Sequence, residues 1–431
     1  MQKLLPQFNN WVKFLLTALI VIVPLYPKFP FIRIPGISVS IRFEDFLLLI
    51  ISLFTLVKIY PKLREFLRDN LVKSIVIFLI IAFISLLSGI YITKTVDLSI
   101  GILHFVRRIE YFVPLFAILV FKDIIKNKNL EFFIKSLMLV TIISFIYGFG
   151  QKYFNLPFIV TQNEEYSKGI ALYYSPGSHI NSTFAGHYDL ATFLVLLLPI
   201  FISSLFLFKE KLTRIFLLIT IFGGLWLLGA SASRISVVSY ILAASISLIF
   251  LKKYKEILLV GMSGLILLMS SGNLYDRYER LIDVLIGVKA AEEVEVFEDR
   301  STSIRLAVEW PRAIRSLTKN PILGTGYSSM GLATDNDYLR LLGELGILGF
   351  LAFGLIFINL YKIFKQSILK LNNYDILERS LIVGVIGGTL GVLINAIFID
   401  VFEASKFVLI FWFVIGITVI TVRNNINVQK S

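Results

Sequence analysis

The stretch SIVIFLIIAFISLLSGI, residues 74–90, contains no charged side chain, and its Ile and Phe residues fall on every face of a helix. About 20 consecutive apolar residues in a helix span the hydrocarbon core of a bilayer. Because this stretch offers no polar face to water, we interpret it as a membrane-spanning helix that contacts lipid on several sides.

Similar apolar runs recur along the chain, which is 57% hydrophobic and 16% charged and has a mean hydropathy of +0.81. Its 38 Phe and 18 Tyr suit lipid-facing helices and interfacial belts. The sequence therefore predicts an all-α, polytopic membrane protein of about 12 transmembrane helices. We place the spans at residues 11–27, 43–60, 72–91, 98–121, 132–154, 188–208, 212–230, 235–251, 257–271, 346–364, 379–399 and 407–422.

The distribution of positive charge predicts the orientation of these spans. Counted with Lys13 near the start of the first span, the two chain ends and the short connections hold 23 of the 42 Lys and Arg residues. Because such residues accumulate in cytoplasmic loops, both termini are expected in the cytoplasm. The net charge of +13 is then a topology signal, and no nucleic-acid partner is expected. The short connections counted here are 58–73, 122–135, 209–214, 252–255 and 362–379.

The longest polar segment, residues 271–345, is predicted to lie outside the membrane on the opposite face. A connection of this length indicates a functional element with helices of its own. We therefore expect three parts: residues 1–270 with helices 1–9, residues 271–345 as an extracytoplasmic loop that carries an active-site lid, and residues 346–431 with helices 10–12 and a cytoplasmic tail.

Several chemistries are disfavoured by the composition. The chain has no cysteine, which excludes disulfides and thiolate metal sites. Its three histidines are too few for a histidine-rich metal cluster, so neither a metal nor another cofactor is predicted. The acidic run from Glu292 to Asp299 has no cation-loop spacing, and we interpret it as a solvated face.

Charged side chains in the predicted span 98–121 are unusual. His104, Arg107, Arg108 and Tyr111 have the spacing of one helical face. An arginine at the membrane centre costs about 2.5–3.5 kcal/mol on insertion scales, so such residues usually line a cavity or meet a partner. The face either forms an anion-binding wall, or it lies near the outer interface with Glu110 paired to Arg107.

Two more candidates stand at the predicted outer ends of helices. His187 lies in the first turn of a helix that Ser182 or Thr183 could cap, where free N–H groups attract an anion; an interfacial packing role suits His187 equally well. Arg234 follows the small residues 229–233, which allow close approach of a ligand. An arginine at a span end also reaches lipid head groups.

The segment STSIRLAVEWPRAIRSLTKNP (301–321) predicts a helix that begins near Ser301 or Thr302. Arg305 and Arg312 share a face, and the guanidinium fork of arginine suits phosphate oxygens. Pro311 is expected to kink this helix or to start its second half.

Two turn-forming segments follow. PILGTG (321–326) predicts a tight turn able to present backbone amides, although it lacks the lysine and preceding strand of a phosphate loop. TDNDYLRLLGEL (334–345) begins with Asp335, Asn336 and Asp337, which are typical helix-capping residues. We expect them to start a helix that continues into the next span.

Four segments, in order, resemble the O-antigen ligase/polymerase superfamily of bacterial envelope glycosyltransferases. They are STFAGHYDLATFLVLLLP (182–199), SASRISVVSY (231–240), RSTSIRLAVEWPRAIRSLTKNPILGTGYSS (300–329) and TDNDYLRLLGELGILGF (334–350). The resemblance implies a membrane glycosyltransferase C-like fold in the bacterial inner membrane. It also implies transfer of a glycan from undecaprenyl diphosphate to an acceptor sugar hydroxyl, as in lipopolysaccharide and other polysaccharide biosynthesis.

The resemblance assigns diphosphate binding to Arg234 and Arg305. Ligases of this superfamily carry a His-Asn pair whose histidine is taken as the catalytic base, whereas this chain has Asp335-Asn336. That departure favours a polymerase over a lipid-A-core ligase, with Asp335 as the candidate base and His187 as the alternative. The other candidates for substrate binding are Arg107, Arg108, Arg312 and Asn336.

The partners implied are a lipid-linked oligosaccharide donor, a glycan acceptor, the lipid bilayer and other membrane proteins of polysaccharide assembly. A transporter or flippase of anionic lipid-linked saccharides is the competing interpretation, but it predicts charged or broken helices near the bilayer midplane. A channel-like or sensory membrane protein with a ligand-binding outer loop is a third class.

Overall fold

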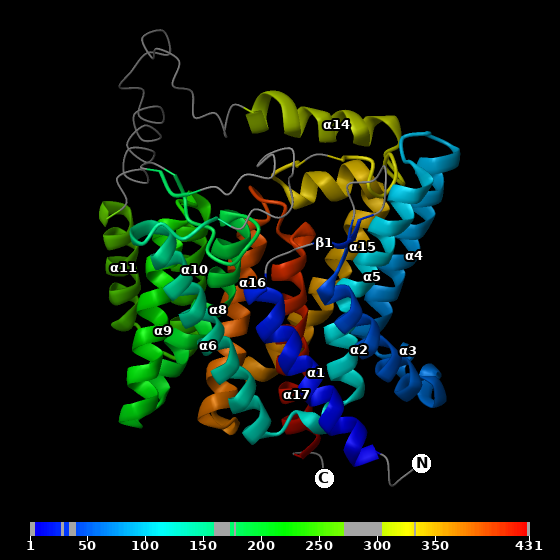
Figure 1. The fold of residues 1–431 in the computed structure, drawn as a ribbon. Helices are drawn as coiled ribbons and strands as arrows, with labels where there is room; N and C mark the ends of the chain where they lie inside the picture. The colour runs from blue at the N-terminus through cyan, green and yellow to red at the C-terminus, as the bar shows by residue number, and fades with distance from the viewer. Residues whose placement is uncertain are drawn as a thin grey trace, which may run out of the picture.

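The computed structural model describes residues 5–26, 30–33, 40–158, 173–175, 178–270, 304–331 and 333–428. In Figure 1, α9–α11 lie on one flank of a helical bundle, α2, α4 and α5 lie on the other, and α16 and α17 lie between them. The first described helix begins, and the last one ends, at the same end of the bundle (Figure 1). Helix α14 (Trp310–Lys319) lies across the opposite end of the bundle. This arrangement matches the predicted placement of both termini on one side, while the cytoplasmic assignment stays a prediction.

A helix covers each of the twelve predicted spans. Within the described residues, nine helices are long and apolar enough to cross a membrane. Of the other three, α5 carries charged residues, and α10 and α11 have only 17 and 15 residues. The all-α membrane class is confirmed, and the number twelve stays a prediction. The helices are α1 (Leu5–Leu25), α2 (Phe43–Ile59), α4 (Asn70–Tyr91), α5 (Leu98–Val120), α6 (Asn127–Tyr153), α8 (His187–Leu207), α9 (Lys211–Ala230), α10 (Arg234–Phe250), α11 (Glu256–Ser270), α15 (Asp337–Ile368), α16 (Ile376–Asn395) and α17 (Ser405–Val428).

Short elements join these helices. Strands β1 (Pro30–Arg33) and β2 (Ser40–Arg42) form one antiparallel pair, which the sequence did not predict. Each strand has one β-branched residue, Ile32 or Ile41, and three or four residues are too few to show a strand pattern beside the apolar runs. The remaining elements are α3 (Leu63–Arg68), α14 (Trp310–Lys319), the π-helix η3 (Arg305–Glu309) and the 3-10 helices η1 (Tyr60–Lys62), η2 (Lys122–Ile124), η4 (Leu371–Asn373) and η5 (Val401–Glu403).

The bundle core is built on α8, α10, α16 and α17. Glycines on α16 allow close packing: a Cβ on Gly387 would lie 2.2 Å from the carbonyl oxygen of Ala243 on α10. Near the predicted outer end, the Asn395 amide donates to Thr192 Oγ1 at 3.1 Å and to Ser236 Oγ at 3.0 Å. These bonds hold the N-terminal parts of α8 and α10 against α16.

Helix α15 is broken at Gly346, whose φ of 65° and ψ of −167° are not helical. The break leaves two N–H groups and two carbonyls of α15 without partners in the helix, and residues of the PILGTG turn (321–326) provide the missing hydrogen-bond partners. The turn amides expected to be available to a phosphate are therefore already bonded, which corrects that expectation. The four bonds run from Ile347 to Pro321 (2.9 Å), from Leu348 to Ile322 (3.2 Å), from Thr325 to Gly343 (2.9 Å) and from Gly326 to Glu344 (3.0 Å).

Candidate functional site

The π-helix η3 places Arg305 at the predicted outer end of the bundle. Pro311 has no N–H, and its ring excludes the normal helical bond to the residue four positions earlier. The N–H of Trp310 donates to the carbonyl of Arg305, five residues earlier, and this bond closes the wide turn of a π-helix. Helix α14 begins at Trp310, and Pro311 is its second residue. The predicted role of Pro311 is confirmed. The expected caps Ser301 and Thr302, like the acidic run 292–299, lie outside the described residues.

Arg305 connects three parts of the fold. Its Nε and Nη2 atoms donate to Asp335 Oδ2 at 2.9 and 2.7 Å. Nη2 also donates to the Tyr188 hydroxyl at 3.2 Å, and the guanidinium lies 5.9 Å from the centre of the Tyr188 ring. The structure thus brings together two candidates, Arg305 and Asp335, and adds Tyr188 from the first turn of α8. Sequence reasoning missed Tyr188, although it is the neighbour of the candidate His187.

This ion pair lies largely out of water, since Arg305 is only 8% exposed. Burial lowers the pKa of Arg305, but Tyr188 and Asp335 outweigh that effect, and its pKa is raised. Burial also raises the pKa of the Asp335 carboxyl, while the Arg305 charge opposes the rise. Asp335 adopts a left-handed φ of 50°, a conformation that aspartate tolerates better than most residues.

Asn336 is the N-cap of α15. Its side-chain oxygen accepts a hydrogen bond from the Leu339 N–H at 2.9 Å, which confirms the predicted cap. The Asp337 carboxylate accepts a hydrogen bond from the Phe402 N–H at 3.1 Å, so it contacts the segment before α17. The substrate-binding role of Asn336 stays a prediction.

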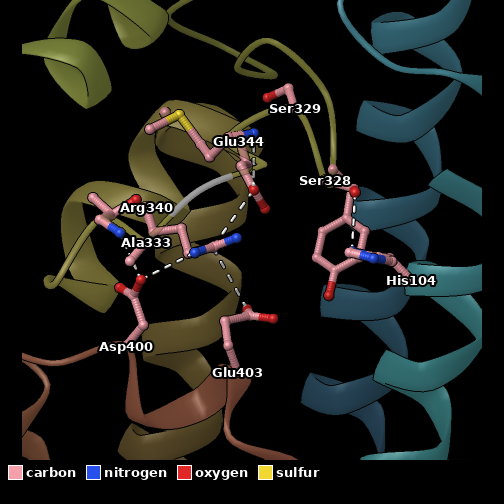
Figure 2. Close-up of polar contacts among 12 residues, drawn as sticks. His104, Ser328, Ser329, Ala333, Arg340, Glu344, Asp400 and Glu403 are labelled. Carbon is pink, nitrogen blue, oxygen red and sulfur yellow. Dashed lines mark hydrogen bonds and ion pairs between the residues drawn. The ribbon is translucent and has the colours of Figure 1, made fainter. Parts of the chain in front are cut away.

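Asp400 fixes the backbone on both sides of Asp335. Its carboxylate accepts from the Thr334 N–H at 2.7 Å and from the Asn336 N–H at 3.1 Å. It also binds Arg340 Nη1 at 3.0 Å, and Figure 2 shows the Arg340 side chain between Asp400 and Glu403. Asp400 and Glu403 were missed as site residues. The sequence could have indicated them, because both are acidic residues in the short connection between the predicted spans 379–399 and 407–422.

Arg108 has protein partners on all of its nitrogens and is 4% exposed. It donates to the Tyr327 hydroxyl at 2.7 Å and to the Phe402 carbonyl at 2.9 Å, and it forms an ion pair with Glu403. These contacts favour a structural role, and substrate binding by Arg108 stays a prediction.

Two other candidates on α5, Arg107 and His104, also have protein partners. Arg107 forms an ion pair with Asp45 of α2 at 3.6 Å. His104 Nδ1 lies 3.0 Å from Ser328 Oγ, as Figure 2 shows. The face of α5 proposed as an anion-binding wall therefore packs partly against the loop 327–328.

His187 is the first residue of α8, and Gly186, rather than Ser182 or Thr183, occupies the N-cap position. Ser182 Oγ donates instead to the Ser144 carbonyl at 2.6 Å, which corrects the expected cap. The His187 ring lies 3.7 Å from that of His179 and 4.0 Å from that of Tyr188, measured between ring centres.

Arg234 begins α10 at the same end of the bundle. The preceding turn is attached to the segment before α8, because the Ile180 N–H donates to the Ala230 carbonyl at 2.9 Å. The first turn of α8 thus contacts Arg305 through Tyr188, and the segment before it contacts the turn that leads to Arg234. Convergence of Arg234 and Arg305 on one ligand stays a prediction.

Arg312 lies on α14 and donates from Nη2 to the Ala333 carbonyl at 2.6 Å. This bond attaches the helix to the loop just before Asp335. Within the described residues, no group of three or more His, Asp or Glu side chains has the arrangement of a metal site.

A cavity of about 860 Å³ lies at the other end of the bundle, between the ends of α6, α8, α9 and α16. Its lining includes Asn127, Glu210 and Asp375 and none of the candidate site residues. The candidate site is therefore the polar cluster around Arg305 and Asp335, and this cavity is separate from it.

Residues 215–354 match the family model described as O-antigen ligase. The match confirms the resemblance to the O-antigen ligase/polymerase superfamily. It includes Arg234, Arg305 and Asp335, whereas Tyr188, Asp400 and Glu403 lie outside the matched residues. A search of curated proteins gave no match.

Proposed function

Because residues 215–354 of this chain match the family model described as O-antigen ligase, we propose that the protein is a membrane glycosyltransferase. It moves a glycan from undecaprenyl diphosphate to a sugar hydroxyl of an acceptor, at the outer boundary of the bacterial inner membrane. Polymerisation is favoured over lipid-A-core ligation, because Asp335 stands where the resembling ligases carry histidine.

The observation that carries the proposal is the position of Arg305. When the bond between the anomeric carbon and the diphosphate oxygen breaks, negative charge grows on the diphosphate. A fixed cation at that point stabilises the transition state with little reorganisation. Arg305 suits this role because Tyr188 and Asp335 orient it, and because arginine keeps its charge and binds two oxygens at once. Arg234 is the second cation in this proposal.

Asp335 orients the Arg305 guanidinium before the donor arrives. A diphosphate carries more negative charge than one carboxylate, so the donor competes for the same guanidinium N–H groups. Two further candidates hold the segments on which Arg305 and Asp335 lie. Asn336 caps α15 next to Asp335, and Arg312 attaches α14 to the loop before Asp335 through its bond to the Ala333 carbonyl. Arginines supply the neutralising charge, and a divalent cation has no role in this proposal.

The test uses purified protein in liposomes with radiolabelled undecaprenyl diphosphate-linked repeat units, and it measures product length and initial rate. Arg305→Ala is expected to lower the rate about 10²–10³-fold, as does loss of one charge-stabilising donor in other enzymes. Arg305→Lys should recover only part of the rate, since lysine lacks the fork.

Arg315→Ala is the matched control, because Arg315 is an exposed arginine further along the same helix. It should leave the rate unchanged. Full activity in both Arg305 variants would overturn the clamp. Movement of the labelled lipid between leaflets without lengthening of the glycan would overturn the transferase and favour a transporter.

A further inference from the structure

Glu309 is an acidic side chain that the proposed clamp does not use. It ends the π-helix η3, four residues after Arg305. Its Oε2 atom is buried and has no hydrogen-bond partner among the described residues. Leaving a buried acceptor unsatisfied costs about 1–3 kcal/mol, so a native protein that carries one invites a functional explanation.

The charges that face Glu309 come from three segments. Asp335 and Asp400 disfavour its ionised form, whereas Arg305 and Arg312 favour it. Burial and then Asp335 dominate, and together they raise the pKa of Glu309 to about 7. A general base works best when its pKa is near the working pH. Asp335 differs from Glu309, because one of its carboxylate oxygens already accepts two bonds from Arg305.

We propose that Glu309 accepts the proton of the acceptor hydroxyl during glycosyl transfer, and that Asp335 positions Arg305. This assignment rests on the function proposed above. The hydroxyl oxygen forms a bond to the anomeric carbon, and the bond from that carbon to the diphosphate oxygen breaks. The electron pair leaves with undecaprenyl diphosphate. The hydroxyl proton passes to the Glu309 carboxylate and then to water.

The spacing of Glu309 and Arg305 suits this division of roles. Arg305 and Glu309 are four residues apart in one wide turn, so both side chains leave η3 on the same side. Such a pair can contact two groups that flank one carbon atom, with Arg305 on the leaving diphosphate and Glu309 on the attacking hydroxyl. The wide turn that Pro311 imposes is part of the arrangement, and π-turns of this kind are frequent at functional sites.

The experiment compares wild type with Glu309→Gln and Glu309→Asp in the liposome assay, across pH 5–9. Wild-type turnover should rise with pH through about 7 and then level off, because the base must be ionised. Glu309→Gln should lower turnover about 10²–10⁴-fold, which is the usual contribution of a general base. Glu309→Asp should keep part of the rate together with the pH dependence. Binding of the labelled donor should be unchanged in both variants.

Glu131→Gln is the matched control, because this exposed glutamate pairs with Lys135 at the other end of the bundle. Asp335→Asn provides a further comparison: it should lower turnover and move the rise to a lower pH, because the charge of Asp335 helps to raise the pKa of Glu309. The assignment to Glu309 would be overturned by wild-type turnover in Glu309→Gln, or by a rise at the wild-type pH in Asp335→Asn. An inactive wild-type protein that still binds the donor would instead overturn the transferase function itself.

Discussion

Arg305 and Asp335 are 30 residues apart in the sequence, and two nitrogens of the Arg305 guanidinium donate to one carboxylate oxygen of Asp335. This bond joins the helix that follows the long polar segment to the cap of α15. Asp400 holds the Asp335 backbone from below through the N–H groups of Thr334 and Asn336. The ion pair is therefore held from both sides, and it fixes where a ligand anion would meet Arg305.

The coupling between Arg305 and Asp335 can be measured by a double-mutant cycle of Arg305→Ala and Asp335→Ala. Because Asp335 acts through Arg305 in the proposed mechanism, the double variant should lose little more activity than Arg305→Ala alone. Residues in direct contact typically couple by about 0.5–3 kcal/mol. The measurement is the initial rate of glycan lengthening for the four proteins. Strictly additive losses would contradict a positioning role for Asp335.

Removal of divalent cations should leave the reaction unchanged. The proposed neutralising charges are the guanidinium groups of Arg234 and Arg305, which do not depend on a metal. Turnover is measured after dialysis against EDTA and again after addition of Mg²⁺ or Mn²⁺. A loss that either metal reverses would show that arginines alone do not carry the diphosphate charge.

The break in α15 gives a stability prediction with a built-in control. A Cβ on Gly346 would lie 2.3 Å from the Ile322 carbonyl oxygen, and its φ of 65° is unfavourable for alanine. Gly346→Ala should therefore lower the unfolding midpoint. Gly354→Ala on the same helix should be neutral or stabilising, because a Cβ there would meet nothing within 4 Å. Thermal unfolding of the two proteins in detergent tests this, and equal midpoints would contradict the account of the break.

The sequence predicted features that depend on neighbouring residues. The apolar runs located the helices, and the Asn336 cap and the role of Pro311 followed from local rules. Relationships across long sequence distances were not predictable in this way. The PILGTG amides bind carbonyls that only the break at Gly346 exposes, and Asp400 reaches Thr334 from 66 residues away. The environment of Glu309 likewise depends on Asp335 and Asp400, which lie in other segments.

Asn336 can be tested for its capping role apart from any role in binding substrate. Asn336→Ala removes the acceptor of the Leu339 N–H and should destabilise the protein by about 1 kcal/mol. Asn336→Ser keeps a capping oxygen and should retain most of the stability. The rate of glycan lengthening and the unfolding midpoint are measured together. An Asn336→Ser protein with wild-type stability and no turnover would assign Asn336 to the substrate.

Arg108 provides a test of whether the charged face of α5 is structural. Arg108→Met removes the closer arginine partner of Glu403, which leaves Arg340 at 4.0 Å, and it removes the donor to the Tyr327 hydroxyl. Breaking a fully buried ion pair costs about 3–5 kcal/mol, and this one should cost less because the Glu403 side chain is 28% exposed. Arg107→Met should cost less, because its contact with Asp45 is 3.6 Å long and both side chains are partly exposed. The unfolding midpoint in detergent measures both effects.

The double variant Arg108→Met/Glu403→Gln removes both charges of the pair. It should recover part of the stability lost in Arg108→Met, because the residue at position 403 then carries no charge that needs the missing guanidinium. Donor binding should follow stability in all of these proteins, since Arg108 contacts protein groups on every nitrogen. A stable Arg108→Met protein that fails to bind donor would instead place Arg108 in the substrate site.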